Sequence, residues 1–284
     1  MHRARRRRAG AVTAATPAPL VDTHCHLVLL ETEGLLQAAL EGAAAAGVQV
    51  IVSVGLNLED SHRNRVLAER HDGVYFSAGW HPHEATPPDA AQLRELDALL
   101  DHPKAVAVGE VGLDLFWRPG YHEVPLDVQQ RSFRLMLDLA AHHHKPVLVH
   151  DREAHAEILD ELSRVPEVRG IMHCFSGDTA HAQRCVERGF AVSFSGIVTF
   201  PNAGGIRAAA RDVAPESFVV ETDAPFLSPV PHRGKVNLPE RVAHTAAEVA
   251  RLRGLAVDDV RELTAATARR ILGVSAHERE HAAG

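Results

Sequence analysis

Residues 105–110 read Ala-Val-Ala-Val-Gly-Glu, a short apolar run that ends in a carboxylate. Such a run of small and β-branched residues predicts a strand buried on both faces, as in a parallel sheet. Further runs of this kind end in histidine or acidic residues, at positions 20–26, 146–150, 170–173 and 218–223. If these runs form a barrel of parallel strands, their ionisable ends should gather on one face of it.

The same runs belong to a longer alternation of strands and helices. Strands are predicted near residues 20–24, 48–54, 74–79, 105–110, 145–150, 168–173, 190–195 and 217–222. Strands that alternate with helices over about 250 residues favour an α/β fold, a single-domain (β/α)8 or TIM barrel. A doubly wound open sheet is the alternative. It would bind a ligand in one crevice, whereas possible ligands here end several strands.

The clearest predicted helix begins after Asp127, which together with Gln130 resembles a capping box. Within it, Phe133 and Ala140 belong to an apolar set with helical spacing. Other helices are expected near residues 33–47, 89–101, 153–164, 179–188, 204–212, 239–253 and 258–272. Gly273 stands where the last of these helices would end.

The composition, 45% hydrophobic and 24% charged, is typical of a globular enzyme. A net charge of -7 argues against a broad basic surface for duplex DNA, although it leaves room for a small groove that binds a phosphate chain. No run approaches the roughly 18 apolar residues of a membrane helix, so no membrane association is expected. The three cysteines lack CxxC spacing and predict free thiols in a cytoplasmic protein.

The two ends of the chain lack the alternating pattern. Residues 1–19 combine an arginine-rich stretch with small residues and prolines, which predicts a disordered basic tail. A signal peptide is the alternative, but no Leu, Ile or Phe precedes Pro17. Residues 274–284 predict a second loose tail, so that residues 20–273 form the expected barrel domain.

The first strand ends in an HxH pair. Residues two apart in a strand point to the same side, so His24 and His26 can reach one ion while Cys25 points away. The pair is weak evidence alone, because the chain has 20 histidines and His81 and His83 repeat the spacing. Its position, at the end of a strand like the other possible ligands, is what favours metal binding.

Four further residues occupy equivalent strand ends: Glu110, His150, His173 and Asp223. A carboxylate at the end of an apolar strand is costly to bury unless it is paired or bound to metal. The two oxygens of Glu110 could bridge two cations. Each residue alone is more often a core residue than a ligand, but accidents at so many strand ends are improbable. Together with the HxH pair they predict a two-metal hydrolytic site.

The motifs at these positions resemble the TatD family of metal-dependent deoxyribonucleases. They read DTHCHL at 22–27, GWHPH at 79–83, GEVGLD at 109–114, HDR at 150–152, HCFSG at 173–177 and ETDAPFL at 221–227. The resemblance runs in order from Leu20 to Gly273. The chain departs from the family in substrate-facing loops, where Leu115-Phe116-Trp117 replaces an aromatic pair and the stretch 117–125 is slightly long.

The resemblance implies a TIM barrel of the amidohydrolase kind and a magnesium-dependent nuclease that trims single-stranded DNA or RNA from the 3′ end. It implies a set of metal ligands, with Glu110 bridging: His24, His26, Glu110, His150, His173 and Asp223. The cofactors would be two divalent ions, Mg²⁺ or Mn²⁺, with Zn²⁺ a further candidate because histidine ligands suit it. We expect a monomer whose partner is its nucleic acid substrate.

The expected reaction is phosphodiester hydrolysis with a metal-activated water, in which Asp223 accepts the proton of the water and Glu110 joins the ions. Phosphate contacts are predicted from Arg152, Arg233 and Lys235. His81 and His83, together with Trp80, are predicted to contact the sugar or base.

Two alternatives follow from the same residues. One is a metal-dependent ester or amide hydrolase on this scaffold, such as a tRNA deacylase, since fold and ligands do not determine the substrate. The absence of a strand-end lysine that could be carbamylated, with Glu110 in its place, favours the nuclease. The other is a non-catalytic nucleic-acid-binding protein, against which the acidic net charge and the intact ligand set argue.

Overall fold

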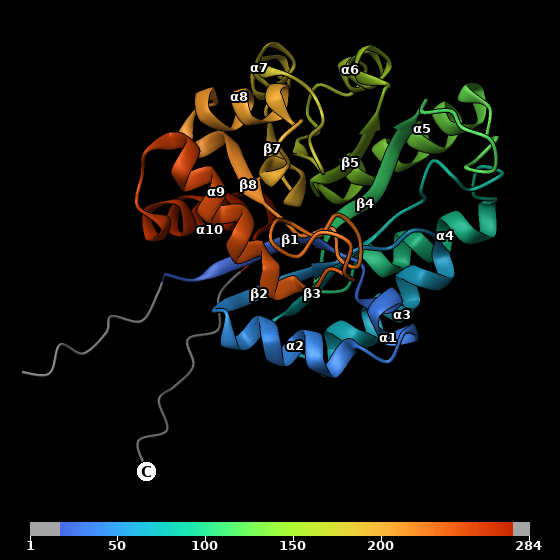
Figure 1. Ribbon diagram of the computed structural model, residues 1–284. Coiled ribbons are helices and arrows are strands. Elements are labelled where there is room, and N and C mark those ends of the chain that lie inside the picture. The colour runs from blue at the N-terminus through green and yellow to red at the C-terminus, as the bar shows by residue number, and fades with distance from the viewer. Residues whose placement is uncertain (1–17, 275–284) are drawn as a thin grey trace, which may run out of the picture.

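A computed structural model describes residues 18–274 and folds them into a barrel of strands surrounded by helices (Figure 1). The tails predicted at 1–19 and 274–284 lie outside the described residues, apart from residues 18, 19 and 274. Among residues 18–274, no helix is both long and apolar enough to span a membrane.

The sheet is parallel, and its strands follow one another in chain order. The strands are β1 (Leu20–Cys25), β2 (Val48–Ser53), β3 (Val74–Ala78), β4 (Ala105–Asp114), β5 (Val147–Arg152), β6 (Gly170–Met172), β7 (Phe190–Phe194) and β8 (Phe218–Val220). Each predicted strand is present with its ends shifted by a few residues, the largest change being the extension of β4 to Asp114.

The sheet closes where β8 meets β1. Cys25 and Ala224 form a parallel bridge, and the His26 N–H donates to the Ala224 carbonyl at 2.8 Å. The Asp223 N–H donates to the His24 carbonyl at 2.9 Å. The predicted TIM barrel is therefore confirmed, and the open sheet is excluded.

Helices surround this barrel (Figure 1). They are α1 (Leu27–Thr32), α2 (Leu36–Ala45), α3 (Leu58–Arg70), α4 (Ala90–Leu100), α5 (Leu126–His143), α6 (His155–Ser163), α7 (Thr179–Glu187), α8 (Gly204–Asp212), α9 (Val242–Arg253) and α10 (Val257–Leu272), with short 3₁₀ turns η1 (Gly196–Thr199), η2 (Pro215–Ser217) and η3 (Pro239–Arg241). As predicted, Gly273 ends the last helix, in a left-handed conformation.

Three features of the helices differ from the prediction. The sequence interpretation missed α3, whose N-cap Asn57 accepts a hydrogen bond from the Asp60 N–H. The helix predicted at 33–47 is the shorter α2, and α1, which precedes it, was missed as well. The predicted capping box at Asp127 is wrong, because α5 begins at Leu126 and Asp127 lies inside its first turn, where it pairs with Arg131.

Apolar side chains of the strands alternate between two cores. In β5, Val147 and Val149 pack with the surrounding helices, whereas Leu148 joins a cluster that includes Ile171 of β6 and Ala268 of α10. His150 has the parity of Leu148 in its strand, and His173 has that of Ile171, so the alternation directs both histidines toward the barrel interior. Two apolar strands, β5 and β6, thereby position the two histidines of a polar site.

Candidate metal centre

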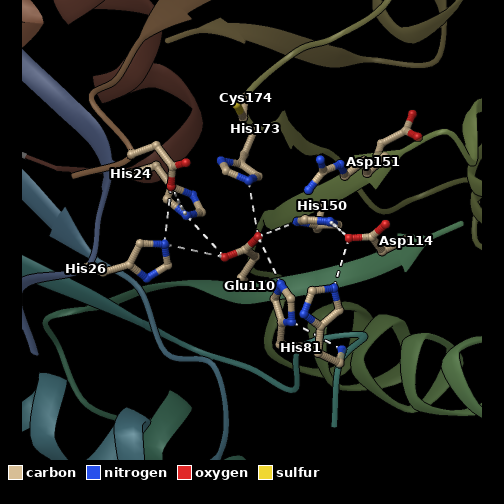
Figure 2. Close-up of polar contacts among 12 residues, drawn as sticks. His24, His26, His81, Glu110, Asp114, His150, Asp151, His173 and Cys174 are labelled. Carbon is tan, nitrogen blue, oxygen red and sulfur yellow. Dashed lines mark hydrogen bonds and ion pairs between the residues drawn. The ribbon is translucent and has the colours of Figure 1, made fainter. Parts of the chain in front are cut away.

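The six predicted ligands lie together at the carboxyl ends of the strands. They are His24 and His26 from β1 and its end, Glu110 from β4, His150 from β5, His173 after β6 and Asp223 after β8. All but His150 are less than 9% exposed. Figure 2 shows the histidine rings turned toward Glu110 from both of its sides.

Glu110 separates the histidines into two groups. Its Oε2 lies 3.2 Å from His24 Nε2 and 3.9 Å from His26 Nε2. Its Oε1 lies 2.7 Å from His150 Nδ1 and 3.1 Å from His173 Nε2. Each carboxylate oxygen therefore faces a separate group of imidazoles, an arrangement that suits a carboxylate shared by two cations.

An irregularity in β4 places Glu110 at this point. The register between β4 and β5 shifts between Val108 and Val111, so the strand bends where Glu110 stands. Its N–H donates at 2.8 Å to the carbonyl of Gly55, which follows β2 rather than belonging to a paired strand. The bend therefore places Glu110, which belongs to an otherwise apolar strand, at the centre of the site.

Asp223 completes the group around the HxH pair. Its Oδ1 lies 3.2 Å from His26 Nε2 and 3.8 Å from His24 Nε2. Its backbone is left-handed, with φ of 59°, a conformation that aspartate tolerates better than most residues and that is common in functional sites. The group formed by His24, His26 and Asp223 brings three possible ligand atoms within 4.8 Å of one another.

Two further carboxylates, to which the sequence interpretation gave no role, orient the histidines. Glu221 Oε1 lies 3.1 Å from His173 Nδ1 and accepts the Cys174 N–H at 2.7 Å. Asp114 Oδ2 lies 3.1 Å from His150 Nε2. Metal-binding histidines usually make such a second contact, which fixes the tautomer. The sequence signal for these two carboxylates was that Asp114 lies in the motif GEVGLD and Glu221 in the motif ETDAPFL.

Electrostatics keep the central carboxylates ionised. Burial opposes ionisation of Glu110, but the surrounding histidines, His173 first, hold its pKa well below the ordinary value. Burial likewise opposes ionisation of Asp223, but the hydrogen bond with His26 and the charges of the neighbouring histidines together outweigh it and lower the pKa. Burial lowers the pKa of His81 to about 4, which leaves this ring neutral. The neighbouring carboxylates raise the pKa of His26, His150 and His173 in spite of burial, that of His150 to about 9. A cation would displace these ring protons, since metal ligation needs neutral imidazoles beside anionic carboxylates.

Unpartnered nitrogens support a fit to metal ions. Within residues 18–274, both ring nitrogens of His24 and Nδ1 of His26 are buried without a hydrogen-bond partner. His24 Nε2 is close to Glu110 but is not aligned with it for a hydrogen bond. An unsatisfied buried polar atom is costly, and a cation would satisfy the nitrogen that faces the carboxylates. The donor set therefore fits divalent ions.

The centre opens into a pocket of about 730 Å³. Of the predicted substrate contacts, His81, His83 and Arg152 line this pocket. His81 reaches the centre itself, with Nε2 at 3.4 Å from Glu110 Oε1. Arg118 and Tyr121, which the sequence interpretation missed because they lie in a loop, line the pocket as well.

The other predicted contacts lie elsewhere. Arg233 is exposed and stacks on Phe200 with its guanidinium 3.7 Å from the ring centroid, and neither it nor the exposed Lys235 lines the pocket. Trp80 is 5% exposed and donates its indole N–H to the Thr86 carbonyl at 2.8 Å. The predicted contact of Trp80 with a sugar or base is therefore wrong, because its ring is core.

Residues 21–273 match the family described as "TatD related DNase". The chain belongs to the TatD family. It is 40% identical to the "Uncharacterized metal-dependent hydrolase YcfH" of Escherichia coli over 90% of this chain and 97% of that protein. It is 34% identical to the "3'-5' ssDNA/RNA exonuclease TatD" of Citrobacter koseri over 75% of this chain and 83% of that protein.

The fold agrees with solved structures of this TatD family. The crystal structure of the TatD homologue YjjV from Escherichia coli superposes with a TM-score of 0.82 at 30% identity, covering 90% of this chain and 98% of that one. The resemblance inferred from the motifs is confirmed, and the chain is a metal-dependent hydrolase of the TatD family.

Proposed function

We propose that this TatD-family hydrolase cleaves phosphodiester bonds of single-stranded DNA from the 3′ end, with RNA as a second substrate. The observation that carries the proposal is the division of the site by Glu110, whose two oxygens face separate groups of histidines. That division suits two cations placed beside a phosphodiester. The name of the Citrobacter relative supports the nucleic acid substrate.

The proposed ligands form two sets with one shared member. His24, His26 and Asp223 would hold one ion, His150 and His173 the other, and Glu110 both. Divalent ions such as Mg²⁺ or Mn²⁺ would supply Lewis acidity toward the phosphate and lower the pKa of water. All six ligands come from one chain, which supports action as a monomer.

The protein side chains would perform the remaining steps. Asp223 lines the pocket, and its carboxylate would accept the proton of the attacking water. Arg152 would bind a phosphate; it is held in place by a hydrogen bond of 2.7 Å to the Tyr121 hydroxyl and by stacking on Phe116, 3.9 Å from its centroid. These contacts order a long side chain before the substrate arrives.

The rim of the pocket suits a single strand. Phe226 lines it and is 50% exposed, with its ring 5.7 Å from that of His26. Arg118 lies on the rim over the ring of Tyr121, at 5.0 Å from its centroid. Exposed aromatic and arginine planes stack on unpaired bases, so a strand could lie across the centre without a broad basic surface.

The test is cleavage of one 30-nucleotide single strand, labelled at either end, with Mg²⁺ or Mn²⁺ and with or without chelator. We expect metal-dependent shortening of the 5′-labelled strand in single-nucleotide steps and early release of the 3′ label. His150→Ala should abolish it, whereas His62→Ala, on α3 with a side chain that is 42% exposed, should retain it. Turnover of carboxyl esters without strand cleavage would instead support the predicted ester hydrolase.

A further inference from the structure

A second cluster of metal-ligating side chains adjoins the candidate centre. Asp114, the last residue of β4, lies on the far side of His150 from Glu110 (Figure 2). His83, from the loop after β3, and His122, from the loop between β4 and α5, approach the same carboxylate. We propose that His83, Asp114 and His122 form a third divalent-metal site, selective for a transition ion such as Zn²⁺.

The spacing of the donor atoms fits one ion. His83 Nε2 lies 2.9 Å from Asp114 Oδ2, and His122 Nε2 lies 3.7 Å from Asp114 Oδ1. A ligand atom from each of the three residues falls within 4.8 Å of the others. Ligands at about 2.0–2.2 Å from a zinc ion stand roughly 3–3.5 Å apart, so small side-chain movements would suffice.

The two imidazoles are arranged as a pair. Their rings stack at 24° with centroids 4.2 Å apart, which brings both Nε2 atoms to one carboxylate. Two histidines with one carboxylate are a donor set for zinc, manganese or iron rather than for magnesium, which prefers oxygen. The chemistry of this cluster therefore differs from that of an ordinary surface acidic patch.

An unpartnered atom independently points to a ligand. His122 Nε2 is buried and has no hydrogen-bond partner within the described part of the chain, since 3.7 Å to Asp114 is too long. The Val124 N–H donates to the other ring nitrogen, Nδ1, over 3.4 Å, a long hydrogen bond that would be given up if His122 changed tautomer to bind an ion. Asp114 Oδ1 accepts the Phe116 N–H at 3.0 Å and keeps a further lone pair.

A bound ion would fasten a loop over the pocket. His122 belongs to the segment between Asp114 and α5 that also carries Arg118 and Tyr121, both on the pocket wall. Joining His122 to Asp114 and His83 would hold this segment against the ends of β3 and β4. The third site would thus control the substrate-facing rim without supplying a ligand to the two-ion centre.

The test counts ions bound by the full chain. Metal-stripped protein is equilibrated with Zn²⁺, desalted and analysed for zinc and protein. We expect His122→Ala and His122→Gln to hold one ion fewer per chain than the wild type and His62→Ala. Equal zinc content in all four proteins would overturn the proposal. The count is independent of nucleic acid cleavage, so failure of the proposed function would leave it intact.

A second measurement reports on the loop. Trp117 is 72% exposed in this segment and is a natural site for chymotrypsin. We expect Zn²⁺ to slow cleavage after Trp117 several-fold in the wild type but not in His122→Gln, with folding of both checked by circular dichroism. Protection of the two proteins to the same degree, or of neither, would overturn the role of His122.

Discussion

At the scale of single residues, the carboxylate of Glu110 decides whether the centre can hold metal. It is 2% exposed and lies within 4 Å of a ring nitrogen of five histidines. Glu110→Gln keeps the size of the side chain but removes its charge. We expect metal affinity to fall by more than the roughly 10–100-fold that loss of an outer-shell partner costs, as measured by competition with a chromogenic chelator.

The matched control for this change is Glu95→Gln, at a carboxylate that is 58% exposed on α4. This variant should bind metal like the wild type. Retention of wild-type affinity by Glu110→Gln would show that the shared carboxylate is not a ligand, whatever its position.

A second residue-scale prediction concerns His155, at the first turn of α6. Its Nδ1 lies 2.8 Å from Asp151 Oδ2, and the hydrogen bond with Asp151 raises its pKa above 6.5 in spite of partial burial. Facing it from α7 and its cap are His181, stacked at 4.1 Å, Arg184, which opposes the shift, and Asp178, which adds to it. The raised pKa means that the pair stabilises the fold when His155 is protonated.

The sign of the pH dependence follows from that shift. Stabilisation is complete below the unfolded-state pKa of about 6.5 and is lost as pH rises through the higher folded-state value. His155→Gln should therefore reduce the free energy of unfolding more at pH 5.5 than at pH 8.5, by at most about 1 kcal/mol for a partly exposed pair. Urea unfolding of both proteins at the two pH values measures this, and equal losses would contradict it.

The six central residues could be predicted from the sequence because each ends an apolar run. The barrel fold alone brings the ends of those runs together. Sequence reasoning could not place Arg233 or Lys235, whose positions depend on the path of a long loop after β8. Nor could it foresee that Trp80 is buried or that His122 meets Asp114, because both depend on tertiary packing rather than on local pattern.

At the scale of elements, the close approach of β3 and β4 keeps Glu110 in position. A Cβ atom on Gly79, just after β3, would lie 2.3 Å from the backbone carbon of Gly109 and 2.7 Å from the nitrogen of Glu110. Gly79→Ala must therefore separate the strand ends. We expect a loss of about 1–3 kcal/mol in the free energy of unfolding, together with weaker metal binding because Glu110 moves.

The matched control is Gly204→Ala in the first turn of α8, where a Cβ would meet no atom within 4 Å. That change should be neutral or slightly stabilising. Denaturant unfolding and chelator competition on both variants test the prediction. Equal effects of the two substitutions would mean that packing at Gly79 does not position Glu110.

The elements were predicted to different degrees for physical reasons. Buried strands were found because both faces are apolar, and only their ends were uncertain. Helix α3 was missed because its inner face is partly polar: Ser61 and Asn64 are buried, and Asn64 donates to the Val54 carbonyl at 2.9 Å. Hydrophobic periodicity cannot reveal a helix that packs through hydrogen bonds.

At the scale of the whole molecule, the candidate centre lies across the seam that closes the barrel. His24 and His26 belong to the first strand and its end, and Asp223 follows the last, so one ion would join the two ends of the sheet. The seam itself has few backbone contacts, the bridge between Cys25 and Ala224 among them. Metal binding should therefore stabilise the entire fold rather than the site alone.

Removal of metal should then lower the melting temperature of the whole barrel. An ion at 100 times its dissociation constant adds about 2.7 kcal/mol per site if it binds only the folded chain. For a protein of this size, each kcal/mol corresponds to roughly 2–4 °C. Calorimetry with Mn²⁺ or with chelator should show one transition that shifts downward by several degrees on chelation. In Glu110→Gln the two conditions should nearly coincide. If chelator left the melting temperature of the wild type unchanged, metal binding would not stabilise the closure between β1 and β8.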